Sequence, residues 1–156
     1  MQHPSVTVLM TEDDPGQAFL IKQYLEETTF KAQDIVHLSD GQELLDYLCR
    51  KGTYEKRERH QAIVILLDLH MPRLDGFETL KQIKSDQRMR VLPVIMLTTS
   101  QSQAEVAHCY QLGCNAYVTK PLELDQFMQT MQRLGHFLKT AQWKTDAWES
   151  NDPQKA

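Results

Sequence analysis

The chain has 156 residues, of which 41% are hydrophobic and 24% are charged. This composition is close to that of an average globular domain and argues against disordered, collagen-like and fibrous proteins. The length suits about one domain, whose core needs no metal or disulfide for stability. Seventeen basic against twenty-one acidic residues give a net charge of −4, so we expect no direct binding to DNA or RNA.

The cysteines and the apolar runs indicate where the chain resides. Cys49, Cys109 and Cys114 form no paired framework, which indicates a reducing compartment. The longest apolar run, Ala62–Leu67, is far shorter than the roughly 20 residues of a membrane span. No apolar signal-peptide region follows the first residues, Met-Gln-His-Pro. We therefore expect a cytoplasmic chain that is not bound to a membrane.

Short apolar runs alternate five times with longer segments of helical spacing. The runs predicted to be strands are Val6–Met10, Ile35–Leu38, Ala62–Leu67, Val94–Leu97 and Ala116–Val118. Helices are predicted between them; the first begins near Pro15, the fourth stops at Gly113 and the last begins near Glu123. This alternation is typical of an α/β fold with a parallel sheet. Because residues 62–67 are all apolar, we place that strand in the middle of the sheet.

Two segments depart from this alternation. Residues 51–61 mix both charge signs and lengthen the connection before the third strand, and we expect a solvated loop there. The last helix has an apolar stripe over about twenty residues, or about 30 Å, which exceeds the roughly 17–20 Å of a strand. The stripe consists of Leu124, Phe127, Met128, Met131, Leu134, Leu138 and Ala141. We therefore expect an extended C-terminal helix.

Polar side chains follow four of the predicted strands. They are Glu12, Asp13 and Asp14 after the first, Asp68 after the third, Thr98, Thr99 and Ser100 after the fourth, and Thr119, Lys120 and Pro121 after the fifth. The carboxyl ends of parallel strands meet at one edge of the sheet, so the carboxylates should converge there. Like charges at such a short distance require a cation, and hard oxygen ligands suit Mg²⁺, with Mn²⁺ as the alternative ion.

Lys120 and Thr98 place an ammonium and a hydroxyl beside this metal, a combination that binds the oxygens of a phosphoryl group. Asp68 ends the most buried strand and is the natural acceptor, because a carboxylate can form an aspartyl phosphate when a metal and a cation neutralise the developing charge. Asp, Thr and Ser are also common in turns and helix caps. Their joint occurrence with a lysine at successive strand ends favours the chemical interpretation.

Four motifs carry a resemblance to a known family. They are the acidic pair Glu12-Asp13, the block Leu66-Leu-Asp-Leu-His-Met-Pro-Arg-Leu-Asp-Gly76, then Leu97-Thr-Thr99 and Lys120-Pro121. In this order they resemble the receiver domain of two-component response regulators, and the central block is the most specific of them. The resemblance implies a flavodoxin-like, doubly wound, five-stranded parallel sheet in the order 2-1-3-4-5, with the receiver domain at residues 5–135.

The resemblance also implies the partner and the metal ligands. A sensor histidine kinase would phosphorylate Asp68, and the domain would be no enzyme beyond its own phosphorylation and dephosphorylation. Four groups would hold Mg²⁺: the carboxylates of Asp13 and Asp68, Glu12 through water, and the backbone carbonyl of His70.

Further roles follow from the same resemblance. Thr98 and Lys120 would bind the phosphoryl oxygens, with a cis peptide bond between Lys120 and Pro121. Tyr117 would be the switch residue that turns inward when Thr98 moves toward the phosphate, a population shift between two arrangements. The side chains of His70 and Ser100 would flank the acyl phosphate and tune the rate of its hydrolysis.

Residues 136–156 are too few for an output domain. We expect them to extend the last helix and to form a dimer arm. Together with the extended connection before the third strand, this arrangement is similar to the stand-alone regulators that serve phytochrome-type kinases in bacteria. Those relatives form homodimers through the last strand-helix face, and the interface residues here would be Phe137, Leu138, Ala141 and Trp143, with Trp148 adding apolar area.

Four other interpretations are distinguishable from this one. A flavodoxin-type flavin carrier shares the strand order, but the acidic first loop would repel its phosphate. A phosphatase of the aspartyl-phosphate kind needs an acid/base Asp where His70 stands. A zinc site at His108, Cys109 and Cys114 lacks a second ligand cluster. A degenerate receiver that acts as a constitutive binding module is the main alternative.

Overall fold

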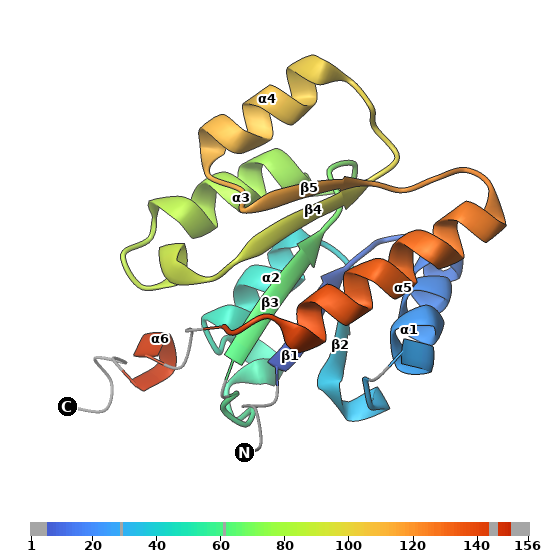
Figure 1. Ribbon diagram of the computed structural model, residues 1–156. Helices are drawn as coiled ribbons and strands as arrows, with labels where there is room; N and C mark the ends of the chain where they lie inside the picture. Colours follow the sequence, from blue (N-terminus) through green and yellow to red (C-terminus); the bar gives the residue numbers. More distant parts are fainter. Residues whose placement is uncertain (1–5, 29, 61, 144–146, 151–156) are drawn as a thin grey trace.

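The chain is built around a parallel sheet (Figure 1). The computed structural model describes residues 6–28, 30–60, 62–143 and 147–150. The strands are β1 (Val6–Thr11), β2 (Ile35–Leu38), β3 (Ala62–Leu67), β4 (Val94–Thr98) and β5 (Ala116–Thr119). In the described part of the chain they form one five-stranded sheet in the order β2-β1-β3-β4-β5, and all neighbouring strands are parallel. The predicted fold class and strand order are therefore confirmed.

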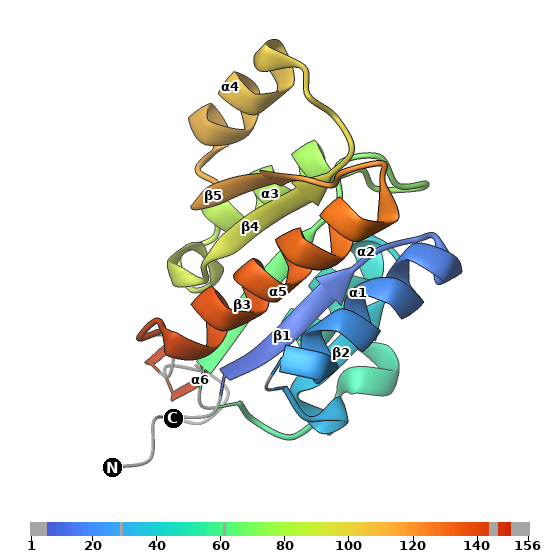
Figure 2. The same cartoon turned by 45° about the vertical axis from the view of Figure 1, so that its right-hand side comes forward.

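One helix follows each strand. They are α1 (Pro15–Thr28), α2 (Gly41–Leu48), α3 (Gly76–Ser85), α4 (Gln103–Leu112) and α5 (Leu124–Thr140), and short 3-10 turns occupy Ala32–Asp34, Gly52–Tyr54 and Met89–Val91. Helices α1 and α5 lie side by side on one face of the sheet (Figure 2). The other three cover the opposite face. Pro15 begins α1, and Gly113 ends α4 with a positive φ of 104°, as predicted.

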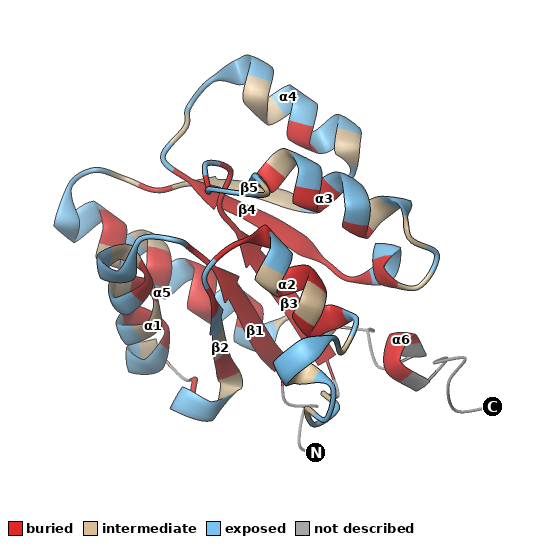
Figure 3. Cartoon of the chain, turned by 180° about the vertical axis from the view of Figure 1, so that it is seen from behind, coloured by how far each residue is buried: buried red, intermediate tan, exposed pale blue. Residues whose placement is uncertain are grey.

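The alternation of side chains along the strands divides the interior into two cores. Leu9, Ile65 and Leu67 point toward α2, α3 and α4, whereas Val8 and Val64 point toward α1 and α5. Every residue of β1, β3 and β4 is buried, so these strands form the buried centre seen in Figure 3. Burial of both faces explains why β3 is apolar without interruption and why β1 and β4 carry threonine as their only polar residue type.

The chain after α5 folds back on the domain. Trp143 donates a hydrogen bond from Nε1 to the Leu138 carbonyl oxygen at 2.8 Å and packs on the core beneath α1 and α5. Trp148, in the short helix α6 (Ala147–Ser150), is only 3% exposed and belongs to the core on the opposite face. The described parts of the tail therefore contact both cores, Trp143 the one beneath α1 and α5 and Trp148 the one on the opposite face.

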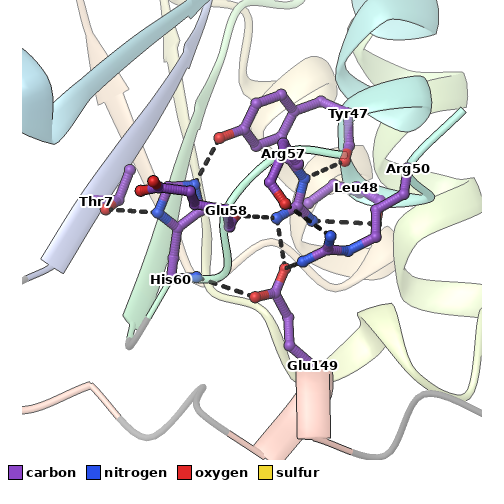
Figure 4. Close-up of polar contacts among 8 residues, drawn as sticks. All are labelled: Thr7, Tyr47, Leu48, Arg50, Arg57, Glu58, His60 and Glu149. Carbon is purple, nitrogen blue, oxygen red and sulfur yellow. Dashed lines mark hydrogen bonds and ion pairs between the residues drawn. The ribbon is translucent and has the colours of Figure 1, made fainter. Parts of the chain in front are cut away.

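A cluster of charged and aromatic residues holds α6 in place (Figure 4). The Glu149 carboxylate lies 2.6 Å from the Arg57 guanidinium and accepts the His60 backbone N–H at 2.9 Å. Arg57 also donates to the Tyr47 carbonyl oxygen at 2.6 Å and lies over the Tyr47 ring. The His60 ring contacts Thr7 Oγ1 of β1 at 3.2 Å. The tail, α2 and the first strand are thus joined through residues 57 and 60.

Two expectations about these segments need correction. The connection over residues 51–61 is exposed in part, but the Arg57 side chain is 6% exposed and His60 turns inward, so it is a docked segment rather than a fully solvated loop. Helix α5 ends at Thr140, and Leu138 is fully buried in the core of the chain. Leu138 and Trp148 are therefore unavailable to a partner in this arrangement, because their apolar surfaces are already covered. Residues 144–146 and 151–156 of the predicted arm lie outside the described residues.

The ion pair at Glu149 generates a stability prediction. Replacing Glu149 by Gln leaves the Arg57 guanidinium without its ion-pair partner, which destabilises the fold. Release of α6 would expose Arg57 to water and so limit the loss of stability. We expect the free energy of unfolding to fall by about 1–3 kcal/mol. Urea unfolding measures this loss, and hydrogen exchange at the His60 amide should accelerate. The matched control is the substitution Glu55→Gln, at an exposed position of the same connection. Equal effects of the two substitutions would contradict the role of Glu149 in holding α6 on the domain.

Candidate functional site

Backbone hydrogen bonds continue past the ends of the strands and hold the first residues of the following loops. The Asp68 N–H donates to the Thr11 carbonyl oxygen at 3.2 Å, and the Lys120 N–H donates to the Thr98 carbonyl oxygen at 2.7 Å. The Glu12 N–H donates to the last residue of β2 at 3.0 Å. These bonds explain why side chains that are remote in sequence meet at the carboxyl edge of the sheet.

Three carboxylates converge at this edge as the sequence predicts. One oxygen atom each from Glu12, Asp13 and Asp68 lie within 4.8 Å of one another. Glu12 is buried, Asp13 is exposed and Asp68 is 9% exposed, so the cluster opens to solvent on the Asp13 side. Hard oxygen ligands at this spacing suit a divalent metal such as Mg²⁺ or Mn²⁺.

Lys120 supplies the opposite charge. Its side chain is 4% exposed, and Nζ lies 2.6 Å from Glu12 Oε2 and 3.9 Å from Asp68 Oδ2. Burial raises the pKa of the Glu12 carboxyl, and the hydrogen bond from Lys120 opposes that rise. The peptide bond before Pro121 is trans, so the predicted cis bond is wrong. The trans form is the lower in energy for an X–Pro bond by about 0.5–1 kcal/mol.

Asp68 has two differently placed oxygens. Oδ1 accepts the Leu69 N–H at 2.8 Å, and Oδ2 faces the Lys120 ammonium. The loop after β3 bends closely over this residue, since the Gly76 N–H donates to the Leu69 carbonyl oxygen at 2.8 Å. A Cβ atom on Gly76 would lie 2.3 Å from the Asp68 carbonyl oxygen. The glycine of the central motif therefore permits the turn that presents Asp68.

Thr98 and Tyr117 meet at the backbone of Ser100. Thr98 is fully buried, and its Oγ1 accepts the Ser100 N–H at 3.4 Å. Tyr117 is half-buried and donates from its hydroxyl to the Ser100 carbonyl oxygen at 2.8 Å. Burial raises the pKa of Tyr117. The two residues predicted to switch are thus joined through one loop.

Sequence reasoning missed Glu105 in this region. The Ser100 hydroxyl donates to its Oε1 atom, and His70 Nε2 lies 3.6 Å from the same oxygen. A Ser-x-x-Glu pattern from Ser102 to Glu105 is visible in the sequence and reads as a helix capping box. Ser102 does accept the Glu105 N–H at 3.3 Å, but the carboxylate of Glu105 is directed to the site instead of the cap.

The alternative zinc site receives no support. Among the described residues, the one group of three or more possible ligands within reach of a common ion is Glu12, Asp13 and Asp68. His108 instead contacts the Phe77 ring at a centroid distance of 5.0 Å. Cys109 is buried, which raises the pKa of its thiol to about 12 and disfavours the thiolate that zinc requires.

This fold and this constellation of residues are those of a module of two-component signalling. The chain belongs to the response regulator receiver domain family, whose model matches residues 8–132. Receiver domains are signalling modules that work with histidine kinases. In the described ranges no helix combines the length and hydrophobicity that crossing a membrane requires.

Individual relatives include regulators from phytochrome signalling. The chain is 35% identical to the probable methanogenesis regulatory protein FilR2 of Methanothrix harundinacea, over 83% of this chain and 81% of that protein. It is 32% identical to the response regulator Rcp1 of Synechocystis, over 86% and 90%. A structure of Mn²⁺-bound Rcp1 aligns with a TM-score of 0.81 over 90% of this chain and 99% of that one.

A second solved structure supports the same relationship. The phosphorylated cyanobacterial phytochrome response regulator RcpA is 34% identical and aligns with a TM-score of 0.80, over 91% of this chain and 99% of that one. The predicted resemblance to phytochrome response regulators is confirmed.

The acidic cluster generates a metal-binding prediction. Asp13→Asn removes one anionic oxygen from the exposed side of the cluster, and we expect Mn²⁺ affinity, measured by titration calorimetry, to fall about tenfold or more. Asp14→Asn is the matched control, since Asp14 is also exposed but its Oδ1 accepts the Gln17 N–H at 3.0 Å, a bond that Asn retains. Equal losses for the two variants would show that the cluster is not the metal site.

Proposed function

We propose that the chain accepts a phosphoryl group on Asp68 from a sensor histidine kinase of the phytochrome type. The single observation that carries this proposal is the environment of Asp68, where one oxygen is held by a backbone N–H and the other faces a buried ammonium beside two further carboxylates. The free cysteines and the negative net charge support a cytoplasmic protein that does not bind DNA directly.

Each residue of the site has a role in the transfer. A carboxylate oxygen of Asp68 attacks the phosphorus of a phosphohistidine, the P–N bond breaks, and the imidazole nitrogen keeps the bonding electron pair. Lys120 and Thr98 stabilise the negative charge on the phosphoryl oxygens, the former with its ammonium and the latter with its hydroxyl. A phosphorylated aspartate then competes with Glu12 for the lysine, because both lie near Nζ in the unmodified chain.

A divalent metal fits this donor set. Asp13, Asp68, Glu12 through water and the carbonyl of His70 would hold Mg²⁺, whose charge would neutralise the phosphoryl oxygens during transfer. Mn²⁺ in the structure of Rcp1 supports a divalent ion at a related site. The buried cation of Lys120 leaves the cluster net negative, so a metal ion remains favoured there.

The phosphorylation proposal is tested directly with a small donor. Acetyl phosphate with Mg²⁺ should place one acid-stable, base-labile label on the wild-type chain, and Asp68→Asn should remove it because an amide is a far weaker nucleophile than a carboxylate. Phosphate-affinity gels and mass spectrometry measure the label, with Asp14→Asn as the control. An unlabelled wild type would favour a constitutive binding module, and turnover of a phosphorylated metabolite would favour a phosphatase.

We also propose that the β5–α5 face carries the output through a homodimer. Phe137 is 52% exposed on α5 and contacts Trp143 edge-on, with Ala141 between them in the chain. Leu124 at the start of the same helix is 56% exposed. Exposed apolar side chains of this kind suit an interface.

Sedimentation tests the dimer and its link to the site together. Beryllofluoride mimics the acyl phosphate, so it should change the monomer–dimer ratio of the wild type and leave Asp68→Asn unchanged. Phe137→Glu should weaken the dimer about tenfold or more, because it places a charge in an apolar contact. Phe19→Glu, on the 68% exposed Phe19 of α1, is the control. Equal weakening by both changes, or a monomer throughout, would contradict this interface.

A further inference from the structure

One carboxylate oxygen bridges two loops beside the phosphoacceptor. Glu105 is the third residue of α4, and its Oε1 atom accepts the Ser100 hydroxyl and lies 3.6 Å from His70 Nε2. Ser100 belongs to the loop after β4, and His70 belongs to the loop after β3. These strands are parallel neighbours, so both loops leave the same edge of the sheet. The Glu105 side chain thus spans the gap between two loops that the sheet itself does not join.

The two bridged residues stand at corresponding positions. His70 follows Asp68 by two residues, and Ser100 follows Thr98 by two residues. The His70 side chain is 62% exposed, and Glu105 supplies the one contact that the structure describes for its ring. An exposed side chain of this kind samples several rotamers. The contact with Glu105 is therefore the restraint on the His70 ring that the structure describes.

Ser100 is held by four separate groups, since its Oγ atom also accepts the Ser102 N–H at 3.3 Å. Its N–H donates to Thr98 Oγ1, its carbonyl oxygen accepts the Tyr117 hydroxyl, and its own hydroxyl donates to Glu105. The Ser102 contact uses a lone pair of the hydroxyl oxygen, whereas the contact to Glu105 uses the hydroxyl hydrogen. The Glu105 contact is consequently the one that fixes the direction of the Ser100 hydroxyl.

We propose that Glu105 is a positioning residue that prolongs the lifetime of the phosphoryl group on Asp68. This inference rests on the proposed function. Hydrolysis requires a water molecule to attack phosphorus, whereupon the bond from phosphorus to the Asp68 oxygen breaks, the carboxylate is regenerated and inorganic phosphate leaves with the protons of water. By holding His70 and Ser100 together, Glu105 keeps these side chains across the approach of that water.

The proposal attributes the effect to position rather than to charge. Glu105→Gln keeps a carbonyl oxygen that can accept the Ser100 hydroxyl and lie beside the His70 ring. Glu105→Ala removes the acceptor and frees both side chains. The two variants therefore separate an effect of position from an effect of charge. The Glu105 side chain is 28% exposed, so either substitution is compatible with folding.

The experiment measures the decay of the aspartyl phosphate in the full chain. Protein labelled with acetyl phosphate and Mg²⁺ is freed of donor, and the remaining label is followed on phosphate-affinity gels. We expect Glu105→Ala to shorten the lifetime about threefold or more and Glu105→Gln to stay within about twofold of wild type. In a His70→Ala/Ser100→Ala background, Glu105→Ala should have no further effect, because the residues through which it acts are gone. Glu26→Ala, on the exposed side of α1, is the control.

The possible outcomes distinguish the positioning role of Glu105 from the proposed phosphorylation of Asp68. A labelled wild type whose lifetime is the same in Glu105→Ala overturns the positioning role alone. The same shortening in the double-alanine background also overturns it, since the effect then bypasses His70 and Ser100. A shortened lifetime in Glu105→Gln assigns the effect to charge and contradicts the inference. A wild type that takes up no label overturns the proposed function and this inference with it.

Discussion

The pairing of Lys120 with Glu12 is the interaction on which the site depends. Both side chains are 4% exposed and their charged atoms lie 2.6 Å apart. Removing two ions from water costs several kcal/mol for each, and the attraction between them roughly offsets that cost, so the pair adds little net stability. Loss of one partner would cost about 3–5 kcal/mol, because the other charge would remain buried alone. The pair keeps the Lys120 ammonium beside Asp68, where it could bind the oxygens of a phosphoryl group.

The sheet has a different kind of constraint at each end. At the carboxyl edge, hydrogen bonds that extend the strand ladders hold the first residues of the loops that carry the charged groups. At the amino edge, Glu149, Arg57 and His60 join the tail, the long connection and the first strand. The contacts between distant segments at the amino edge thus lie at the opposite end of the sheet from Asp68.

Much of the fold and the site follows from local patterns in the chain. Strand β3 is apolar throughout because both of its faces are covered, and this pattern predicts a central strand from the sequence alone. Asp68 and Lys120 were predicted to converge because the ends of parallel strands must share an edge. The course of the tail was not predictable in this way. The apolar character of Leu138 in the stripe and of Trp148 beyond it predicts burial, but it does not distinguish the chain's own core from a partner.

Glu105 was missed for a related reason. A glutamate three residues after a serine has a local explanation as a helix cap, and the helix does begin there with Ser102 as its cap. The Glu105 carboxylate points toward Ser100 and His70, which belong to two different loops. The spacing of these three residues in the sequence does not predict that their side chains come together. Because Thr98, Tyr117 and Glu105 all contact Ser100, a movement of Thr98 toward a phosphoryl group would act on the contacts that Ser100 makes with Tyr117 and Glu105. The loop after β4 is therefore the element in which a change at Asp68 would reach the β5–α5 face.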